Sequence, residues 1–173
     1  MSSKDECKLV IGSEKEGQWY EETGKCLQNM HDKLRGRLLT TMEVAFPSGK
    51  QLEALKARIK DIQGEIWDTL YDRRHQQFGN WFSVLKSDEA TDTKPSEEQF
   101  HAGVIKFQKD LDQVIVEELD WFKKIVIKLI VLAAERQQKQ EALKSEVERL
   151  IGDASWKLRK WLGGVKNIFL DVR

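Results

Sequence analysis

Two acidic–histidine pairs in the chain have the spacing that metal ligands use on a helix. Glu98 and His101 form a Glu-x-x-His pattern, and Asp72 and His75 repeat its spacing. Helical di-iron proteins combine two such pairs with a carboxylate from each of two further helices, all directed inward. Asp72 and His75, however, lie in a basic stretch, and His101 lies in the opening turn of an expected helix. We therefore expect neither a metal site nor a bound cofactor.

The acidic cluster Glu117, Glu118 and Asp120 is the second group that could do chemistry. General acid–base catalysis needs two carboxyl groups that converge on one cleft, whereas adjacent residues of a helix point about 100° apart. Pairing with Lys or Arg on a neighbouring helix is the better interpretation. The sequence also lacks the Gly-rich, HExxH and CxxC patterns of common catalytic sites. We expect a protein that is not an enzyme.

The residues best suited to binding lie in the segment from 153 onward. They combine large apolar side chains with a basic cluster: Trp156, Lys157, Arg159, Lys160, Trp161, Leu162, Val165, Ile168 and Phe169. A basic amphipathic helix can dock in a groove of a protein partner, or lie on an anionic membrane surface. It can also pack back on its own bundle and complete the core, as most amphipathic helices do.

Charge and composition exclude several classes of function. The chain has 29 basic and 29 acidic residues, so nucleic-acid binding is not expected. Its two cysteines form neither a disulfide framework nor a metal-binding pattern. The longest apolar run, residues 125–134, is about half the ~20 residues that a membrane-spanning helix needs. With no apolar signal segment at the start, the expected location is cytoplasmic.

A regular ladder of aliphatic residues predicts how the chain folds. Its members follow one another at spacings of three or four residues: Leu52, Leu55, Ile59, Ile62, Ile66 and Leu70. This spacing keeps one stripe of a helix facing a partner helix. Only two prolines interrupt 173 residues. We predict an all-α fold of long antiparallel helices in a coiled-coil-like bundle, with three long helices and a shorter amphipathic C-terminal helix.

Breaks in the pattern predict the boundaries of these helices. Pro47 and Gly49 separate the first two helices, and Gly152 precedes the last. The expected ranges are a loose N-terminal arm at 1–17, then a single domain at 18–173 with helices at 18–45, 49–86, 97–151 and 153–170 and a mobile loop at 87–95.

The polar heptad 135–141 leaves one boundary open. The apolar stripe after it, which includes Leu143 and Val147, is in phase with the stripe before it. One helix over 97–151 is therefore expected, with a hairpin that turns near 135–141 as the alternative. A single helix of that length would leave Leu143 and Val147 uncovered, so we expect a homodimer or higher oligomer formed through residues 122–170.

These features favour a non-enzymatic interaction or assembly module. It would self-associate and dock an unidentified protein partner through its C-terminal amphipathic helix. The alternative is a helical bundle that binds an anionic membrane surface, or inserts into it, through the basic, Trp-rich C-terminal segment.

Overall fold

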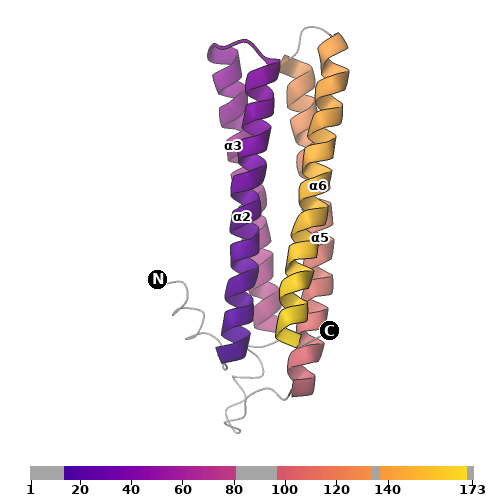
Figure 1. Cartoon of the computed structure of the whole chain (residues 1–173). Helices are drawn as coiled ribbons and strands as arrows, with labels where there is room; N and C mark the ends of the chain where they lie inside the picture. Colours follow the sequence, from indigo (N-terminus) through magenta and orange to yellow (C-terminus); the bar gives the residue numbers. More distant parts are fainter. Residues whose placement is uncertain (1–13, 81–96, 134–136, 171–173) are drawn as a thin grey trace.

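Four long helices make up the structure, a computed structural model that describes residues 14–80, 97–133 and 137–170. They are α2 (Glu14–Ala45), α3 (Lys50–Phe78), α5 (Glu97–Ala133) and α6 (Gln137–Leu170). The helices lie side by side, and each runs antiparallel to the next along the chain (Figure 1). Helix α2 packs against α3 and α6, and α5 packs against the same two helices. The predicted all-α bundle is confirmed.

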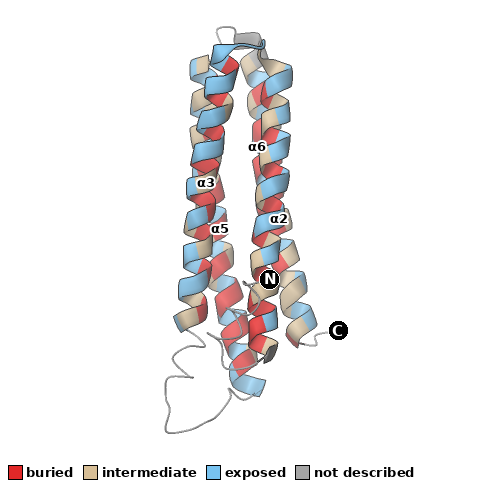
Figure 2. Ribbon diagram, turned by 90° about the vertical axis from the view of Figure 1, so that its left-hand side faces the viewer, coloured by how far each residue is buried: buried red, intermediate tan, exposed pale blue. Residues whose placement is uncertain are grey.

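One stripe of every helix is buried along the axis of the bundle, and the outer faces are exposed (Figure 2). All six residues of the ladder from Leu52 to Leu70 are buried on α3. The buried stripe of α5 runs from Phe100 to Ile130, and that of α6 begins at Leu143. The three–four spacing thus identified the core-facing stripe because each helix has two neighbours on one side and solvent on the other.

Two polar side chains of α3 fix its register against α2. The indole Nε1–H of Trp67 donates a hydrogen bond to the carbonyl of Leu27 at 2.7 Å. One turn away, Gln63 Nε2 donates to the carbonyl of His31 at 2.9 Å. The His31 ring also stacks on Trp67, with 5.0 Å between ring centroids. These contacts satisfy buried donors while holding the two helices at one relative height.

Aromatic residues join three helices at the end of the bundle where α2 begins. The Trp19 ring meets Phe107 edge-on at 4.6 Å, and it also packs on Phe78 and Phe100. Close by, the Arg74 guanidinium lies 3.9 Å from the centre of the Tyr20 ring. Edge-on ring pairs and cation–π contacts stabilise a fold beyond what the burial of their apolar area contributes. This end of the bundle is therefore well packed.

The prediction of one helix over 97–151 is wrong, because α5 ends at Ala133 and α6 begins at Gln137. The alternative hairpin is the one observed, since α5 and α6 pack against each other in antiparallel fashion. Turning back lets the stripe at Phe122 and Val126 and the stripe at Leu143 and Val147 face one shared core. Burial of both stripes outweighs the helix propensity of the polar residues, which is a weak preference by comparison.

The last helix is longer than the predicted range 153–170, because α6 starts sixteen residues earlier, at Gln137. Gly152 lies inside α6, between the buried residues Ile151 and Ala154. Gly163 and Gly164 do not break the helix either. The four helices therefore have comparable lengths of 32, 29, 37 and 34 residues.

The remaining boundaries differ less from the prediction. Helix α2 starts at Glu14 rather than at 18, so residues 14–17 of the expected arm are helical. Residues 1–13 lie outside the described part of the chain, as do the expected loop 87–95 and the last residues of the expected helix 49–86. Gly49 precedes α3 with a φ of +150°, a backbone conformation that favours glycine.

No helix of the described ranges has a stretch that is both long and apolar enough to cross a lipid bilayer.

Candidate functional site

The nine predicted binding residues divide into three groups around α6. Leu162 is fully buried, with 0% of its surface exposed, and belongs to the core rather than to a binding surface. Trp161 is half-buried against the core, and the Nζ of Lys33 from α2 lies 5.8 Å from its ring. Much of the expected docking face therefore closes the bundle.

The basic residues of the segment are held on α6 by local partners. Lys157 pairs with Asp153 at 3.0 Å, one turn earlier on the same helix. Arg159 Nε donates to the carbonyl of Ser155 at 3.2 Å. Lys160 lies over the ring of Trp156, with Nζ at 4.9 Å from its centre. The basic cluster thus forms an ordinary polar surface around one exposed indole.

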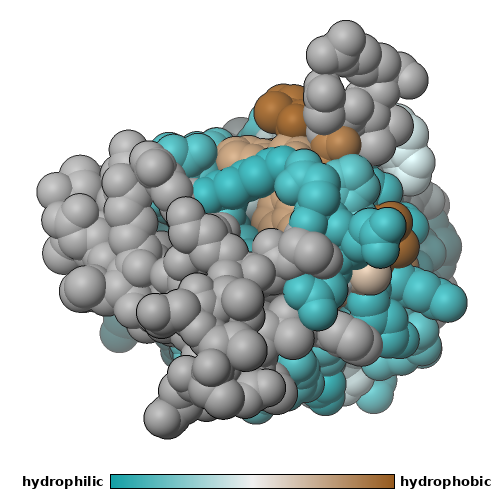
Figure 3. Space-filling view, turned by 90° about the horizontal axis from the view of Figure 1, so that it is seen from below, coloured by the Kyte–Doolittle hydropathy of each residue, from teal (hydrophilic) through white to brown (hydrophobic). Residues whose placement is uncertain are grey.

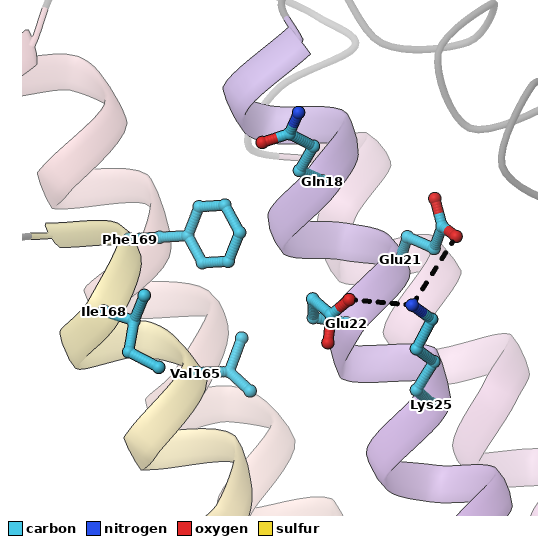
Figure 4. Close-up of a pocket in the computed structure, with 7 residues that line it drawn as sticks. All are labelled: Gln18, Glu21, Glu22, Lys25, Val165, Ile168 and Phe169. Carbon is cyan, nitrogen blue, oxygen red and sulfur yellow. Dashed lines mark hydrogen bonds and ion pairs between the residues drawn. The ribbon is translucent and has the colours of Figure 1, made fainter.

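Val165, Ile168 and Phe169 form the third group, which lines a groove between α6 and α2. They stand at helical positions i, i+3 and i+4, so one face of α6 carries all three. The facing wall comes from the first turns of α2: Gln18, Glu21, Glu22 and Lys25. Figure 4 shows the Phe169 ring and Val165 directed from α6 toward α2. The groove has a volume of about 320 Å³.

The two walls of this groove differ in chemistry. On α2, Lys25 Nζ lies 2.9 Å from Glu22 and 4.0 Å from Glu21, as the dashed lines in Figure 4 show. The hydrogen bond and the negative charge of Glu22 raise the pKa of Lys25, which stays protonated. Two carboxylates share one ammonium group, so this wall keeps an excess of negative charge. The α6 wall is apolar throughout.

Ile168 is the most exposed member of the apolar wall, with 76% of its surface accessible. The described residues visible at the end of the bundle where α2 begins and α6 finishes are mainly hydrophilic, with a few separate apolar patches (Figure 3). Ile168 is continuous with Val165 and Phe169, so the three side chains form one apolar surface along the α6 side of the groove.

The α2 half of the groove was missed at the level of sequence. Glu21, Glu22 and Lys25 look like ordinary solvated residues of a helix, and nothing local distinguishes them. Their significance depends on the pairing of the first helix with the last, which is a property of the bundle topology. The tertiary arrangement alone reveals it.

A second groove between α2 and α6 lies at the opposite end of the bundle, with a volume of about 420 Å³. It is lined by small and apolar residues with one acid: Thr40, Thr41, Val44, Ala45, Ala142, Leu143 and Glu146. At the same end, Val44 and Leu132 are 85% and 83% exposed. This end therefore carries apolar surface without the acidic wall of the first groove.

The structure does not bring together the residues that could form a catalytic or metal-binding site. The Nδ1 of His75 lies 2.9 Å from the hydroxyl of Tyr20, and His101 packs edge-on to Phe100. Among the residues that the structure describes, no three His, Cys, Asp or Glu side chains are grouped so as to hold a metal ion. In the cluster at 117–120, Asp120 pairs with Lys123 and Lys124 of its own helix. These ion pairs lie within α5, not between helices as the sequence indicated.

Burial shifts the pKa of several other groups, three of which are Cys26, His31 and Asp112. It raises the pKa of the Cys26 thiol to about 11, with a further contribution from Glu22. It lowers the pKa of His31, assisted by the charge of Arg35. It raises the pKa of Asp112, against the opposing hydrogen bond from Gln108. These three groups lie on different surfaces, so they do not form a catalytic site.

Comparison of the chain with protein-family models, with curated proteins and with solved structures finds no match.

Proposed function

We propose that the protein is a non-enzymatic interaction module that binds a short segment of a protein partner in the groove formed by Val165, Ile168 and Phe169 of α6 and by Glu21 and Glu22 of α2. The observation that carries this proposal is the exposure of Ile168 beside an acidic wall. Removing such a side chain from water contributes about 25 cal/mol per Å² of apolar area, so an apolar side chain is favoured as the occupant.

The chemistry of the walls defines the segment that fits. An aliphatic or aromatic anchor packs on Ile168 and Phe169, and a Lys or Arg beside it approaches Glu21 and Glu22. At about 320 Å³ the groove is at the small end of ligand sites, so it suits one or two side chains rather than a whole helix. The binding is accordingly of the transient kind.

A membrane-surface role is less well supported by the same residues. Insertion of the predicted amphipathic face would take Leu162 out of the core, where its surface is completely buried. Without Leu162, the two exposed anchors are Trp156 and Ile168. Their separation of twelve residues places them about 120° apart around α6, so both cannot enter one flat surface. Co-sedimentation with anionic liposomes at low salt tests this alternative.

Self-association is not required for the proposed binding. The argument for an oligomer began from Leu143 and Val147, which a single long helix would leave uncovered. Both are buried within one chain, with 6% and 0% of their surface exposed. An assembly would therefore use other apolar surface, of which Val44 and Leu132 are the most exposed.

Selection from a random peptide library displayed on phage tests the proposal without knowledge of the partner. The chain is immobilised, and peptides that also bind the Ile168→Glu variant are removed. We expect the remaining sequences to share an apolar residue next to Lys or Arg. The proposal is wrong if no sequence is enriched, or if every enriched sequence binds the variant as well.

A further inference from the structure

Helix α5 carries a second ladder of regularly spaced residues beside the stripe that faces the core. Its members, which we call the outer ladder, follow one another at spacings of four, three, four, three and four residues: Val114, Glu118, Trp121, Ile125, Lys128 and Leu132. The bundle covers them only in part, since Trp121 is 49% and Leu132 83% exposed. The spacing is that of a helix packed lengthwise on a partner helix, so the outer ladder is suited to contact with a further helix.

The outer ladder lies on the side of α5 that faces away from α6. Burial raises the pKa of Asp112, and the charges of Arg159 and Lys166 of α6 oppose that shift, so Asp112 is on the side nearer to α6. Trp121 comes nine residues later, which at about 100° per residue places it about 180° around the helix from Asp112. Because α5 packs against α3 and α6, the outer ladder borders α3. It is therefore separate from the groove between α2 and α6.

This part of α5 is more apolar than its two neighbouring helices can cover. Lys128 is the one charged residue of the stretch 125–132. Val126 and Ile130 are fully buried in the core, whereas Leu132 is exposed. Single apolar side chains on a surface need no explanation, but a line of them along one helix marks contact with another molecule.

The two charged members of the outer ladder are available to pair with that molecule. Elsewhere on the same helix, Asp120 lies 3.4 Å from Lys123 and 3.1 Å from Lys124. Glu118 and Lys128, by contrast, have no ion-pair partner among the residues that the structure describes. A partner that covers the ladder is therefore favoured if it brings a basic group to Glu118 and an acidic group to Lys128.

The order of side chains along the outer ladder is complementary to its own reverse. The six members form three pairs that stand at equal separations on either side of position 123: Trp121 with Ile125, Glu118 with Lys128, and Val114 with Leu132. A second copy of α5 that runs antiparallel, with a two-fold axis at this position, would bring the members of each pair face to face. Apolar side chains would then meet apolar ones, and each acid would meet a base.

Other arrangements of two copies match less well. In a parallel pair, Glu118 would face Glu118 and Lys128 would face Lys128. A shift of the antiparallel pair by one heptad, in either direction, would set a charged member against an apolar one. Lys124 would lie near the two-fold axis, but it is already paired with Asp120 of its own helix. The charges thus select one direction and one register.

From these relationships we propose that the protein forms a symmetric homodimer in which α5 packs antiparallel on α5 of a second copy through the outer ladder. From Val114 to Leu132 the contact is about 27 Å long. A standard specific interface buries about 800 Å² per partner, and a contact of this length between single helices is at the small end of that class. The dimer should therefore dissociate reversibly at micromolar concentration. The groove between α2 and α6 stays open, so this inference does not rest on the proposed function.

Reversal of single charges tests both the contact and its direction. Sedimentation equilibrium of the full chain, from micromolar to hundreds of micromolar, should follow a monomer–dimer equilibrium. Glu118→Lys sets a base against Lys128 of the second copy, and Lys128→Glu sets an acid against Glu118. Each variant should raise the dissociation constant about tenfold or more, because like charges then meet twice in each dimer. Glu148→Lys is the matched control, since it makes the same charge change at an exposed position of α6.

The two charge variants should complement each other. An equimolar mixture of Glu118→Lys and Lys128→Glu offers opposite charges at both contacts, so it should form a heterodimer. The chain that carries both substitutions should dimerise as the wild type does. A parallel dimer would already set like charges together, so neither single substitution would weaken it.

Several results would overturn the inference. A wild type that stays monomeric over the whole range would do so, as would charge variants that dissociate no more readily than Glu148→Lys. Failure of the doubly substituted chain to dimerise would also contradict the antiparallel register. Trp121→Glu provides a measurement without charge exchange, because it places two acids at the centre of the contact and should abolish the dimer. Circular dichroism of each variant separates loss of the dimer from loss of the fold.

The same variants separate the homodimer from other occupants of the outer ladder. Co-sedimentation of a monomeric wild type with phosphatidylserine vesicles, abolished by Trp121→Glu, would assign the ladder to a lipid surface and overturn the proposal. The dimer and the proposed function also fail independently. Ile168→Glu should leave the dissociation constant of the dimer unchanged, and Trp121→Glu should leave the binding of library-selected peptides unchanged. Loss of the dimer in Ile168→Glu would contradict the placement of the contact on α5.

Discussion

Trp67 of α3 donates its indole N–H to the backbone carbonyl of Leu27 of α2, across 2.7 Å in the buried interior. The bond joins residues forty positions apart and fixes the height of α2 within the bundle. That height determines which turns of α2 face the end of α6. The acidic wall of the groove is therefore positioned, in part, by a contact with a different helix.

Trp67→Phe should destabilise the fold without changing its architecture. The variant keeps a buried ring but loses a hydrogen bond, which contributes about 1 kcal/mol, and it leaves unfilled space where the indole was larger. We expect a loss of about 1–3 kcal/mol in the free energy of unfolding, measured by urea titration. Trp156→Phe is the matched control, since Trp156 is 54% exposed and should change stability little. Equal losses in both variants would contradict the role given to the bond.

Gly152→Ala should stabilise the protein by about 0.5–1 kcal/mol. Gly152 lies inside α6, and a methyl group added there meets no atom within 4 Å. Gly24→Ala should have the opposite effect, because its added carbon would lie 2.8 Å from Nη2 of Arg74, whose guanidinium is held in place by burial and by its packing on the Tyr20 ring. Thermal unfolding of the two variants beside the wild type measures this difference in sign. A lower melting temperature for Gly152→Ala would contradict this prediction, because it would show that the glycine itself contributes to stability.

Asp112→Asn should raise stability at pH 7 and lose this effect in acid. Burial raises the folded-state pKa of Asp112 above its ordinary value of 3.8, so its ionisation opposes folding. The stability linked to its neutral form is complete below pH 3.8 and is lost as the pH rises through the folded-state pKa. Asparagine removes that loss and can still accept the hydrogen bond from Gln108 Nε2, which is 2.8 Å long.

Asp120→Asn provides the control for this pH dependence. Hydrogen bonds from Lys124 and Lys123 lower the pKa of Asp120. Its contribution to stability is thus present above pH 3.8 and is lost as the pH falls through the lower folded-state pKa. Replacement by asparagine should leave stability at pH 7 unchanged or reduced. Urea midpoints at pH 3 and pH 7 test both variants, and the same sign for both would contradict the assignment.

If the chain self-associates at tens of micromolar, the contact should involve the end of the bundle that carries Val44 and Leu132. Light scattering measures the mass of the assembly. The two side chains are the most exposed large apolar residues of the described chain. We expect Val44→Asp/Leu132→Asp to yield a monomer and Ile168→Glu to leave the mass unchanged. A wild-type chain that is strictly monomeric would rule out the assembly.

The sequence predicted the class of fold and the core-facing residues well, because helical periodicity is a local signal. The ladder from Leu52 to Leu70 needed no tertiary information to be identified. One helix over 97–151 was predicted where the structure has two antiparallel helices, α5 and α6, because strong helix formers around residues 135–141 concealed a reversal that shared burial favours. The sequence also overestimated how much of the C-terminal segment is available for binding, because Leu162 belongs to the core. The α2 wall of the groove could not be predicted, because Glu22 comes to lie across the groove from the end of α6 only in the folded bundle.

The affinity of one selected peptide for three forms of the chain tests the central claim most directly. Isothermal titration of that peptide into the wild type, Ile168→Glu and Ile105→Glu compares an exposed isoleucine in the groove with one outside it. The account predicts that Ile105→Glu binds as the wild type does and that Ile168→Glu binds at least tenfold more weakly. Equal affinity for all three chains would contradict the assignment of the groove as the binding site.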